Sequence, residues 1–297
     1  MDNELKKFVA IVEAGTFTRA AETLRISQPG LSVAMRKLEK RLGVALFERT
    51  GRHGLVLTNA GNQLYAACLE HRRIDHDLAL QLVALGNEKI PLRIGMIDSV
   101  AALMCSQEEP FRMLEASTEL SLHVLHSAAL RRAVRRSELD LAIVVADDKE
   151  DDRLEVAATA IDRLVFVCTP ELGQKVRLDI EQGRPVPFLS YVQHSATFAV
   201  IQRALSRSHI VVDPLLYSAS PDTILAMTQR GWGAAVLPKS LVADAISHGA
   251  LMEISSHGEP LYIERHLHVV TLKGRKLPPR LAGLAYAMRE QLRSYTI

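Results

Sequence analysis

Hydroxyl-bearing and ionisable side chains recur directly after predicted strands in the C-terminal two thirds of the chain. They are Asp98-Ser99, His126-Ser127, His194-Ser195 and, close by, Thr197. In open parallel sheets, ligands bind beyond the carboxyl ends of the strands, where helix N-termini offer free amides and a positive dipole end. The pattern therefore predicts a pocket for a small molecule, with an organic acid as the favoured ligand.

Two alternatives stay open for these residues. Each serine can simply cap its own helix, and only the recurrence at three equivalent strand ends favours a pocket. Asp98 disfavours an anionic ligand, because a second carboxylate raises the cost of placing negative charge there. Protonated His126 or His194 would offset that cost. Because of the Asp98 carboxylate, an amine is the alternative ligand class.

Motifs for catalysis do not accompany the predicted pocket. The chain has no G-x-S-x-G, P-loop or H-E-x-x-H pattern. The run Gly231-Trp232-Gly233 lacks the third glycine and the strand-before, helix-after context of a dinucleotide site. His71 with Asp75, and His266 with His268, offer too few ligands for a metal. We therefore expect no enzyme, no cofactor and no metal site.

The balance of charge differs between the two ends of the chain. The whole sequence carries 36 basic and 34 acidic residues, but residues 1–61 hold ten Lys and Arg against six Asp and Glu. This excess predicts a polyanionic partner for the N-terminal segment. No apolar run is long enough to span a membrane, and the acidic, amphipathic N-terminus is not a signal peptide. Three widely spaced cysteines fit reduced thiols, so we expect a cytoplasmic protein.

Two helical patterns separated by a short turn organise the N-terminal segment. A first helix, Asn3 to Ala14, precedes them. The pair covers residues 18–24 and 28–41, joined by Arg25-Ile26-Ser27, with Ser27 as N-cap and Pro29 tolerated in the first turn. Such a pair predicts a helix-turn-helix, in which the second helix, Gln28 to Arg41, enters the major groove of DNA.

The segment after this pair predicts a wing and then a long helix. A glycine-punctuated basic tip at residues 48–54 precedes a short strand at 55–57, which places Arg49 and Arg52 near phosphates or the minor groove. Thr58 can cap a helix that runs to Leu85. Its apolar residues recur about every seven positions, which predicts a homodimer formed through residues 59–85. We expect domains at 1–58, 59–89 and 90–297.

The C-terminal segment alternates between strand and helix patterns. This order predicts a parallel sheet covered on both faces, and an α/β fold class for the chain overall. Strands are expected at 92–97, 120–125, 139–145, 164–168, 187–191, 210–216, 234–237 and 262–272. Helices are expected at 99–114, 127–136, 196–206, 220–230 and 279–295.

The N-terminal residues resemble the winged helix-turn-helix of LysR-type transcriptional regulators. The matches at fixed spacing are Phe8, Glu13, Gly15, Thr16, Phe17, Thr18, Ala20, Ala21, Leu24, Ser27, Gln28, Pro29, Ser32, Leu38, Glu39, Leu42, Gly43, Leu46, Phe47, Arg49, Arg52, Leu57, Thr58, Ala60 and Gly61. The remainder resembles the family's effector domain more weakly, at residues 92–95, 138–143 and 225–238.

The resemblance implies an architecture and partners that spacing alone does not show. The effector domain would have two α/β lobes like a periplasmic binding protein. Lobe I would be about 90–161 and 267–297, lobe II about 162–266, with crossing strands near 160–163 and 265–267. Dimers would pair into homotetramers, bind an interrupted palindrome in double-stranded DNA, and respond to an effector between the lobes by changing contact with RNA polymerase.

Functional residues follow by position from the same resemblance. Gln28 suits adenine and Arg36 suits guanine or phosphate. Gly30 stands where alanine is usual, at a cost of roughly 1 kcal/mol in helix propensity. The predicted DNA contacts are Thr18, Arg19, Ser27, Gln28, Pro29, Ser32, Val33, Arg36, Lys37, Arg49 and Arg52. The predicted effector contacts are Asp98, Ser99, His126, Ser127, His194, Ser195 and Thr197. The alternative functions are a two-lobed solute-binding protein and a ligand-independent architectural DNA-binding protein.

Overall fold

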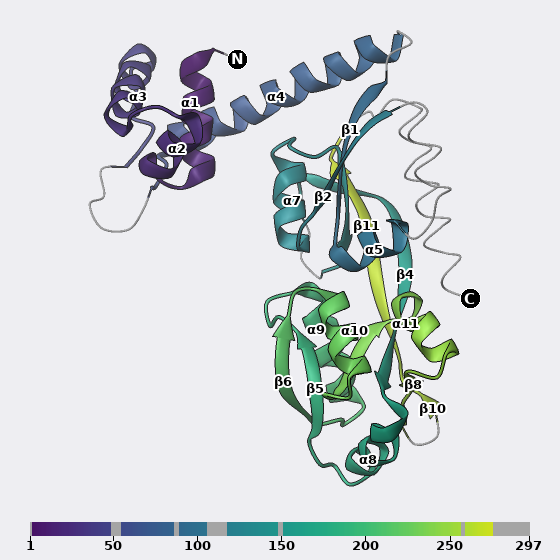
Figure 1. Cartoon of the computed structure of the whole chain (residues 1–297). Coiled ribbons are helices and arrows are strands. Elements are labelled where there is room, and N and C mark those ends of the chain that lie inside the picture. Colours follow the sequence, from purple (N-terminus) through teal and green to yellow (C-terminus); the bar gives the residue numbers. More distant parts are fainter. Residues whose placement is uncertain are drawn as a thin grey trace. The chain divides into compact units, whose positions relative to one another are not determined.

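The computed structural model describes residues 2–48, 55–85, 89–105, 118–147, 151–256 and 259–275. The chain divides into two compact units, Met1–Leu82 and Val83–Ile297. The N-terminal unit is helical and the C-terminal unit is α/β, as the sequence predicts (Figure 1). The predicted wing tip with Arg49 and Arg52, the helix beyond residue 105 and the final helix at 279–295 lie outside the described residues.

Three short helices with well-defined caps build the N-terminal unit. They are α1 (Asn3–Ala14), α2 (Phe17–Leu24) and α3 (Gln28–Leu42). The Ser27 hydroxyl accepts from the Gly30 amide at 3.2 Å, and Gly43 ends α3 in the left-handed conformation that glycine adopts without strain. The predicted N-cap of the second helix is therefore correct, and Gly43 ends the helix one residue beyond Leu42.

The core of this unit forms where the three helices meet. Phe8, Leu31 and Leu38 are fully buried, and the Phe47 ring lies 5.6 Å from the Phe8 ring, centroid to centroid. Phe47 is held by an antiparallel bridge to Leu57, which closes the base of the predicted wing. The bridge is isolated, so residues 55–57 form a shorter element than the predicted strand.

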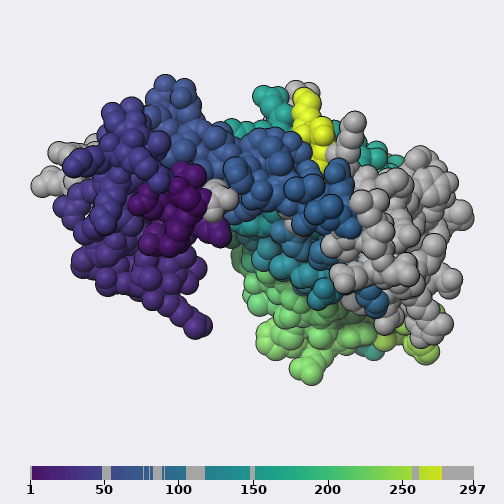
Figure 2. All heavy atoms as spheres, turned by 90° about the horizontal axis from the view of Figure 1, so that it is seen from above, coloured from purple at the N-terminus to yellow at the C-terminus, as the bar shows by residue number. Residues whose placement is uncertain are grey.

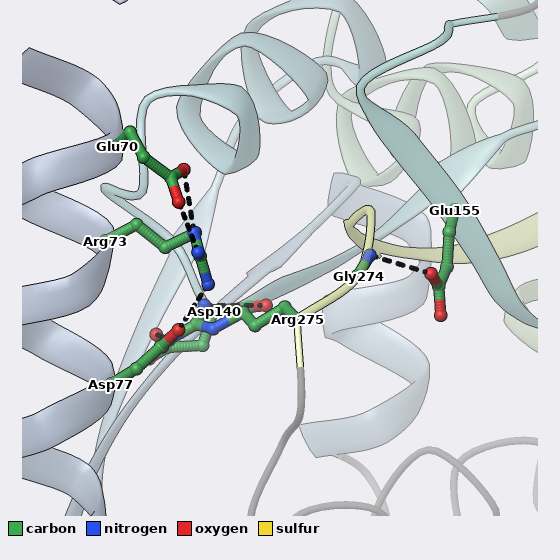
Figure 3. A network of polar contacts seen from close by, with 7 residues as sticks. All are labelled: Glu70, Arg73, Asp77, Asp140, Glu155, Gly274 and Arg275. Atoms are coloured by element: carbon green, nitrogen blue, oxygen red, sulfur yellow. Dashed lines mark hydrogen bonds and ion pairs between the residues drawn. The ribbon is translucent and has the colours of Figure 1, made fainter. Parts of the chain in front are cut away.

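Helix α4 (Asn59–Leu85) follows the wing and begins at the predicted cap. The Gly61 amide donates to the Thr58 hydroxyl at 3.0 Å. Along the helix, the guanidinium of Arg73 bonds Glu70 and, at 3.0 Å, Asp77 (Figure 3). Ion pairs at this spacing, between side chains of the same helix, stabilise the helix. Among the described residues, no helix is long and apolar enough to cross a membrane.

The described strands of the C-terminal unit form one nine-stranded sheet and a two-stranded ribbon. The sheet runs in the order β2-β1-β3-β11-β4-β7-β5-β6, with β8 beside β4. The bounds are β1 (Ile90–Met96), β2 (Thr118–Val124), β3 (Leu141–Val145), β4 (Leu154–Cys168), β5 (Val186–Tyr191), β6 (Val212–Ser218), β7 (Ala234–Pro238), β8 (Met252–Glu253), β9 (Ser255–Ser256), β10 (Glu259–Pro260) and β11 (Tyr262–Leu272).

The sheet is mixed, which corrects the prediction of a parallel sheet. β1 pairs in parallel with β2 and β3, and β5 pairs in parallel with β6 and β7. The long strand β11 pairs with β4 in antiparallel direction along the whole of β11 (Figure 1). They carry the chain from one half of the sheet to the other and back, so they must run in opposite directions.

Two separate hydrophobic cores lie on either side of this crossing. One cluster draws on residues 92–145, 160 and 267–270, and the other on residues 164–263. Among the described helices, five that lie beside the sheet are α5 (Asp98–Cys105), α7 (Ser127–Arg135), α9 (Ala196–Arg207), α10 (Pro221–Gln229) and α11 (Lys239–Ser247). The first four lie at residues that were largely predicted to be helical. The predicted lobe boundaries near 162 and 266 stay predictions, and they fall between these clusters.

Two helices were not predicted. They are α8 (Pro170–Glu181) and α11. α8 begins with Pro170 in its first turn, a position that proline favours, and α11 follows Pro238 directly. Apolar residues recur at helical spacing in both segments, at Leu172, Val176 and Ile180 in α8 and at Leu241, Val242 and Ala245 in α11. The sequence therefore carries a signal for both helices.

A buried carboxylate stabilises the end of the sheet where β1 and β3 begin. Asp140 is fully buried and accepts from the guanidinium of Arg275 at 2.8 Å and from that of Arg93 at 3.0 Å. The backbone amide of Arg93 donates to the same carboxylate at 2.7 Å. Figure 3 shows Arg275 reaching Asp140 from the turn after β11, next to the bond from the Gly274 amide to Glu155. Paired in this way, the buried charges are tolerated.

Candidate nucleic-acid interface and ligand pocket

Helix α3 has one buried and one exposed face. Leu31, Met35 and Leu38 point into the core, while Val33 and Arg36 lie on the opposite side and are exposed. Val33 exposes 42% of its surface and gives this face an apolar position. An exposed face with one apolar and several polar residues suits base edges and thymine methyl groups.

All the predicted DNA contacts within the described residues are solvent-accessible. Ser32 is partly exposed, and the exposed ones are Thr18, Arg19, Ser27, Gln28, Pro29, Val33, Arg36 and Lys37. The Gln28 amide donates to the Ser32 hydroxyl at 3.2 Å, which orders two of these side chains along the same face. Arg49 and Arg52 lie outside the described residues. The assignment to DNA stays a prediction for each residue.

Gly30 has a local reason to be glycine. A Cβ atom at this position would lie 2.9 Å from the Ser27 hydroxyl oxygen, which is the capping acceptor. Glycine therefore keeps the N-cap of α3 unobstructed. This gain offsets part of its unfavourable helix propensity.

A cavity of about 330 Å³ lies at the helix starts of the C-terminal unit. Its size is at the lower end for a small-molecule site. Six of the seven predicted effector residues line it, namely Asp98, Ser99, His126, Ser127, Ser195 and Thr197. The other lining residues are Ile97, Val124, Leu125, Tyr191, Ala196, Ala219 and Pro221. His194 is exposed and does not line the cavity, and its role as an effector contact stays a prediction.

Several of these polar side chains also serve the fold. The Ser195 hydroxyl caps α9 by accepting from the Phe198 amide at 3.0 Å. The Ser127 hydroxyl accepts from the Val145 amide at 3.1 Å, and the His126 ring caps α7. The two interpretations of these residues are therefore compatible. The same side chains cap helices and line the cavity.

Arg265 is the central residue of this region, and sequence reasoning missed it. Its side chain exposes only 1% of its surface. The guanidinium donates to the Asp162 carboxylate, to the Ser99 hydroxyl at 2.9 Å and to the Thr197 hydroxyl at 3.1 Å. One buried cation thus connects both crossing strands with the starts of α5 and α9.

A signal for Arg265 exists in the sequence of β11. Residues 263, 265 and 267 alternate with exposed ones, so they share the buried face of the strand. Ile263 and Leu267 make that face apolar, and an arginine between them requires a buried acid. Asp162 supplies it from the paired position on β4.

Two further groups shape the electrostatics of the cavity. Burial, and then repulsion from Asp222, raise the pKa of Asp98 above the usual range of a carboxyl. Tyr191 is 5% exposed, and its hydroxyl has no hydrogen-bond partner in the described part of the chain. Burial raises the pKa of Tyr191, so the phenol stays protonated and can donate.

A second, larger hollow of about 570 Å³ lies beside α9 and β11. Its wall includes His266, His268, Arg203 and Arg207, with Asp147 and Glu264 among them. Sequence reasoning did not predict it. Within the described ranges, no group of three side chains is placed to hold a metal.

The cysteines are not arranged for redox chemistry in the described part of the chain. Cys68 and Cys168 are buried and unpaired, as expected. Burial raises the pKa of Cys168 to about 11, which leaves the thiol protonated and unreactive near neutral pH. The side chain of Cys105 lies outside the described residues.

A helix-turn-helix unit joined to a two-lobed α/β unit with a ligand-sized cavity defines a DNA-binding regulator with an effector domain. Two family models match the chain: the bacterial regulatory helix-turn-helix of the lysR family over residues 3–62, and the LysR substrate binding domain over residues 86–293. The chain belongs to the LysR family of transcriptional regulators.

Individual relatives agree with this family. The chain is similar to the RuBisCO operon transcriptional regulator of Acidithiobacillus ferrooxidans, with 26% identity over 94% of this chain and 90% of the relative. Its fold resembles the crystal structure of ArgP from Mycobacterium tuberculosis, with a TM-score of 0.66, 16% identity and coverage of 98% and 97%. It also resembles Vibrio fischeri DarR in complex with DNA, with a TM-score of 0.50, 18% identity and 96% coverage of each chain.

Asp98→Asn should raise the thermal stability of the ligand-free protein at neutral pH. The raised pKa means that the ionised carboxylate costs stability in the folded state, and the amide removes that cost. We expect the melting temperature to rise by roughly 1 to 3 °C at pH 7. The difference should shrink as pH falls through the folded pKa, where Asp98 is protonated in the wild type. Differential scanning calorimetry across pH measures this.

Asp213→Asn is the matched control, because that carboxylate is exposed on β6. Its melting temperature should follow the wild type at every pH. A gain for Asp98→Asn that did not depend on pH, or a loss at pH 7, would contradict the assignment of an unfavourable carboxylate.

Proposed function

We propose that this chain binds a palindromic promoter site through α3 and responds to a small molecule held in the cavity of about 330 Å³. The cavity is the observation that carries the second half of this proposal. Its polar wall comes from helix starts on both sides of the crossing strands, and Arg265 links them. A ligand there would contact both lobes at once, and it would therefore favour one arrangement of the lobes.

The DNA half of the proposal rests on the exposed face of α3. Gln28 can pair with adenine through its amide, and Arg36 with guanine or a phosphate. Val33 adds an apolar surface of the kind that contacts a thymine methyl group. Arg49 and Arg52 would contact phosphates or the minor groove from the wing. The positive excess of residues 1–61 adds affinity that does not depend on sequence.

A homodimer through α4 would supply the two-fold symmetry that a palindrome requires. Ile74, Leu78 and Leu82 are spaced by four residues and expose 53%, 53% and 60% of their surfaces. In the space-filling view of Figure 2, the N-terminal unit is drawn in purple and blue. An apolar stripe on a helix is covered economically by a second copy. Pairing into a tetramer, contact with RNA polymerase and action in the cytoplasm complete the proposal.

Arg36→Ala should weaken binding to the DNA upstream of the protein's own gene by roughly 10- to 100-fold, because one base or phosphate contact is lost. Arg49→Ala should also weaken binding. If Arg49 contacts a phosphate, it should flatten the dependence of log K on log salt by about one unit. Fluorescence anisotropy with labelled duplex, repeated at several salt concentrations, measures both quantities.

Lys175→Ala is the control, since it removes an equal charge from the exposed surface of α8, outside the helix-turn-helix. It should leave affinity and salt slope unchanged. Wild-type affinity and slope in both arginine variants would refute the proposed interface.

Leu78→Asp should dissociate the homodimer, because a carboxylate on the apolar stripe would be buried without a partner in the dimer. Sedimentation velocity on the full chain should show monomers at concentrations where the wild type is dimeric. Ala66→Asp places the same charge on an exposed position of α4 away from the stripe and should stay dimeric. An unchanged sedimentation coefficient for Leu78→Asp would exclude this helix face as the dimer contact.

A further inference from the structure

The cavity has more carboxylates nearby than cations to balance them. Asp98 lies in the first turn of α5 and lines the cavity. Asp222 lies in the first turn of α10, next to the lining residue Pro221. The two helices belong to opposite lobes, and repulsion from Asp222 is, after burial, the second cause that raises the pKa of Asp98. Within the described residues, neither forms an ion pair or accepts a side-chain hydrogen bond.

The buried cation of this region is already engaged. Arg265 bonds the Asp162 carboxylate through two of its nitrogens, and Asp162 is itself mostly buried. The remaining donors reach Ser99 and Thr197. Arg265 and Asp162 therefore neutralise each other, and Asp98 and Asp222 stay uncompensated. An anion added to this cavity would be repelled by both, which argues against the simple organic acid favoured from sequence.

Tyr191 gives an independent sign that a polar ligand group belongs here. It lies at the end of β5, lines the cavity and is 5% exposed. Its hydroxyl is buried and has no hydrogen-bond partner among the described residues. Leaving such a group unsatisfied is costly, so a buried hydroxyl without a protein partner indicates a partner that comes from elsewhere.

We propose that the effector of this pocket carries an ammonium group, bound by Asp98 and, from the other lobe, by Asp222. This inference rests on the proposed function, because it names the ligand class of the same cavity. Asp98 is half-buried and supplies most of the attraction, whereas Asp222 is exposed and its charge is screened by water. The ammonium group would balance the two carboxylates across the cleft.

A carboxylate on the same ligand would also find a place in the cavity. Helices α7 and α9 have no acidic residue in their first turns, unlike α5 and α10. Their N-terminal dipole ends therefore remain free to attract negative charge. Amines and aminocarboxylates of a few carbon atoms fit the volume of about 330 Å³ and are the appropriate probes.

Matched pairs of compounds test this inference on the full-length protein by isothermal titration calorimetry. Putrescine is compared with 1,4-butanediol, and 4-aminobutyrate with butyrate, so that each pair differs in its amino groups. We expect the amine of at least one pair to bind at least about tenfold more tightly than its partner. Asp98→Asn should weaken that binding at least about tenfold, and Asp222→Asn about threefold. Asp213→Asn should leave it unchanged.

Three results would overturn the inference: neither amine binding more tightly than its matched partner, amine affinity that survives Asp98→Asn, or no binding of either amine at about 10 mM. Failure of the proposed function is a different result. It would appear as wild-type DNA affinity in the Arg36 and Arg49 variants. Binding of butyrate that is insensitive to Asp98→Asn would reject the ammonium ligand and leave a ligand-responsive regulator in place.

Discussion

The guanidinium of Arg265 is the interaction on which the C-terminal unit depends. A buried charge is tolerated only where it is paired and its donors are satisfied. Arg265 meets both conditions, with Asp162 beside it and the Ser99 and Thr197 hydroxyls beyond it. Its planar fork of donors suits this task, because a single cation must reach three partners in different directions. These partners come from β4, α5 and α9, so one side chain fixes the junction of the two lobes.

In this arrangement, the hydroxyl groups that line the cavity also take part in the hydrogen bonds that join the two lobes. Ser99 and Thr197 line the cavity, and both are bonded to Arg265. A ligand that competes for either hydroxyl alters a bond that joins α5 or α9 to the crossing strands. The volume of the cavity, about 330 Å³, suits a small molecule. A signal to the DNA-binding unit would then begin as a change in how the lobes are held.

Local features of the sequence predicted much of the fold. Ser27, Gly43 and Thr58 act within one helical turn, so their roles as cap or stop could be assigned without knowledge of distant residues. The bounds of β11 also follow from an uninterrupted extended pattern. The mixed sheet was missed because the direction of β4 and β11 depends on the path of the whole chain. α8 and α11 were missed although their apolar residues recur at helical spacing.

The chemistry of the pocket was predictable only in part. Polar residues at helix starts are a local pattern. Six of the residues predicted from it line the cavity: Asp98, Ser99, His126, Ser127, Ser195 and Thr197. Arg265 and Asp162 are 103 positions apart, and only the register of two strands brings them together. Tyr191 ends an apolar strand, and the residues that share the cavity with it include 97–99 and 124–127, far from it in the sequence. His194 follows the same strand, but it is exposed and does not line the cavity.

Hydrogen–deuterium exchange on wild type and Arg265→Lys tests most directly whether this guanidinium holds the two lobes together. Lysine keeps the charge for Asp162, but its single ammonium group cannot reach both hydroxyls. The account predicts that amides at the starts of α5 and α9 exchange at least about tenfold faster in the variant, together and in both lobes. Faster exchange confined to β4 and β11, or no change at either helix start, would contradict it.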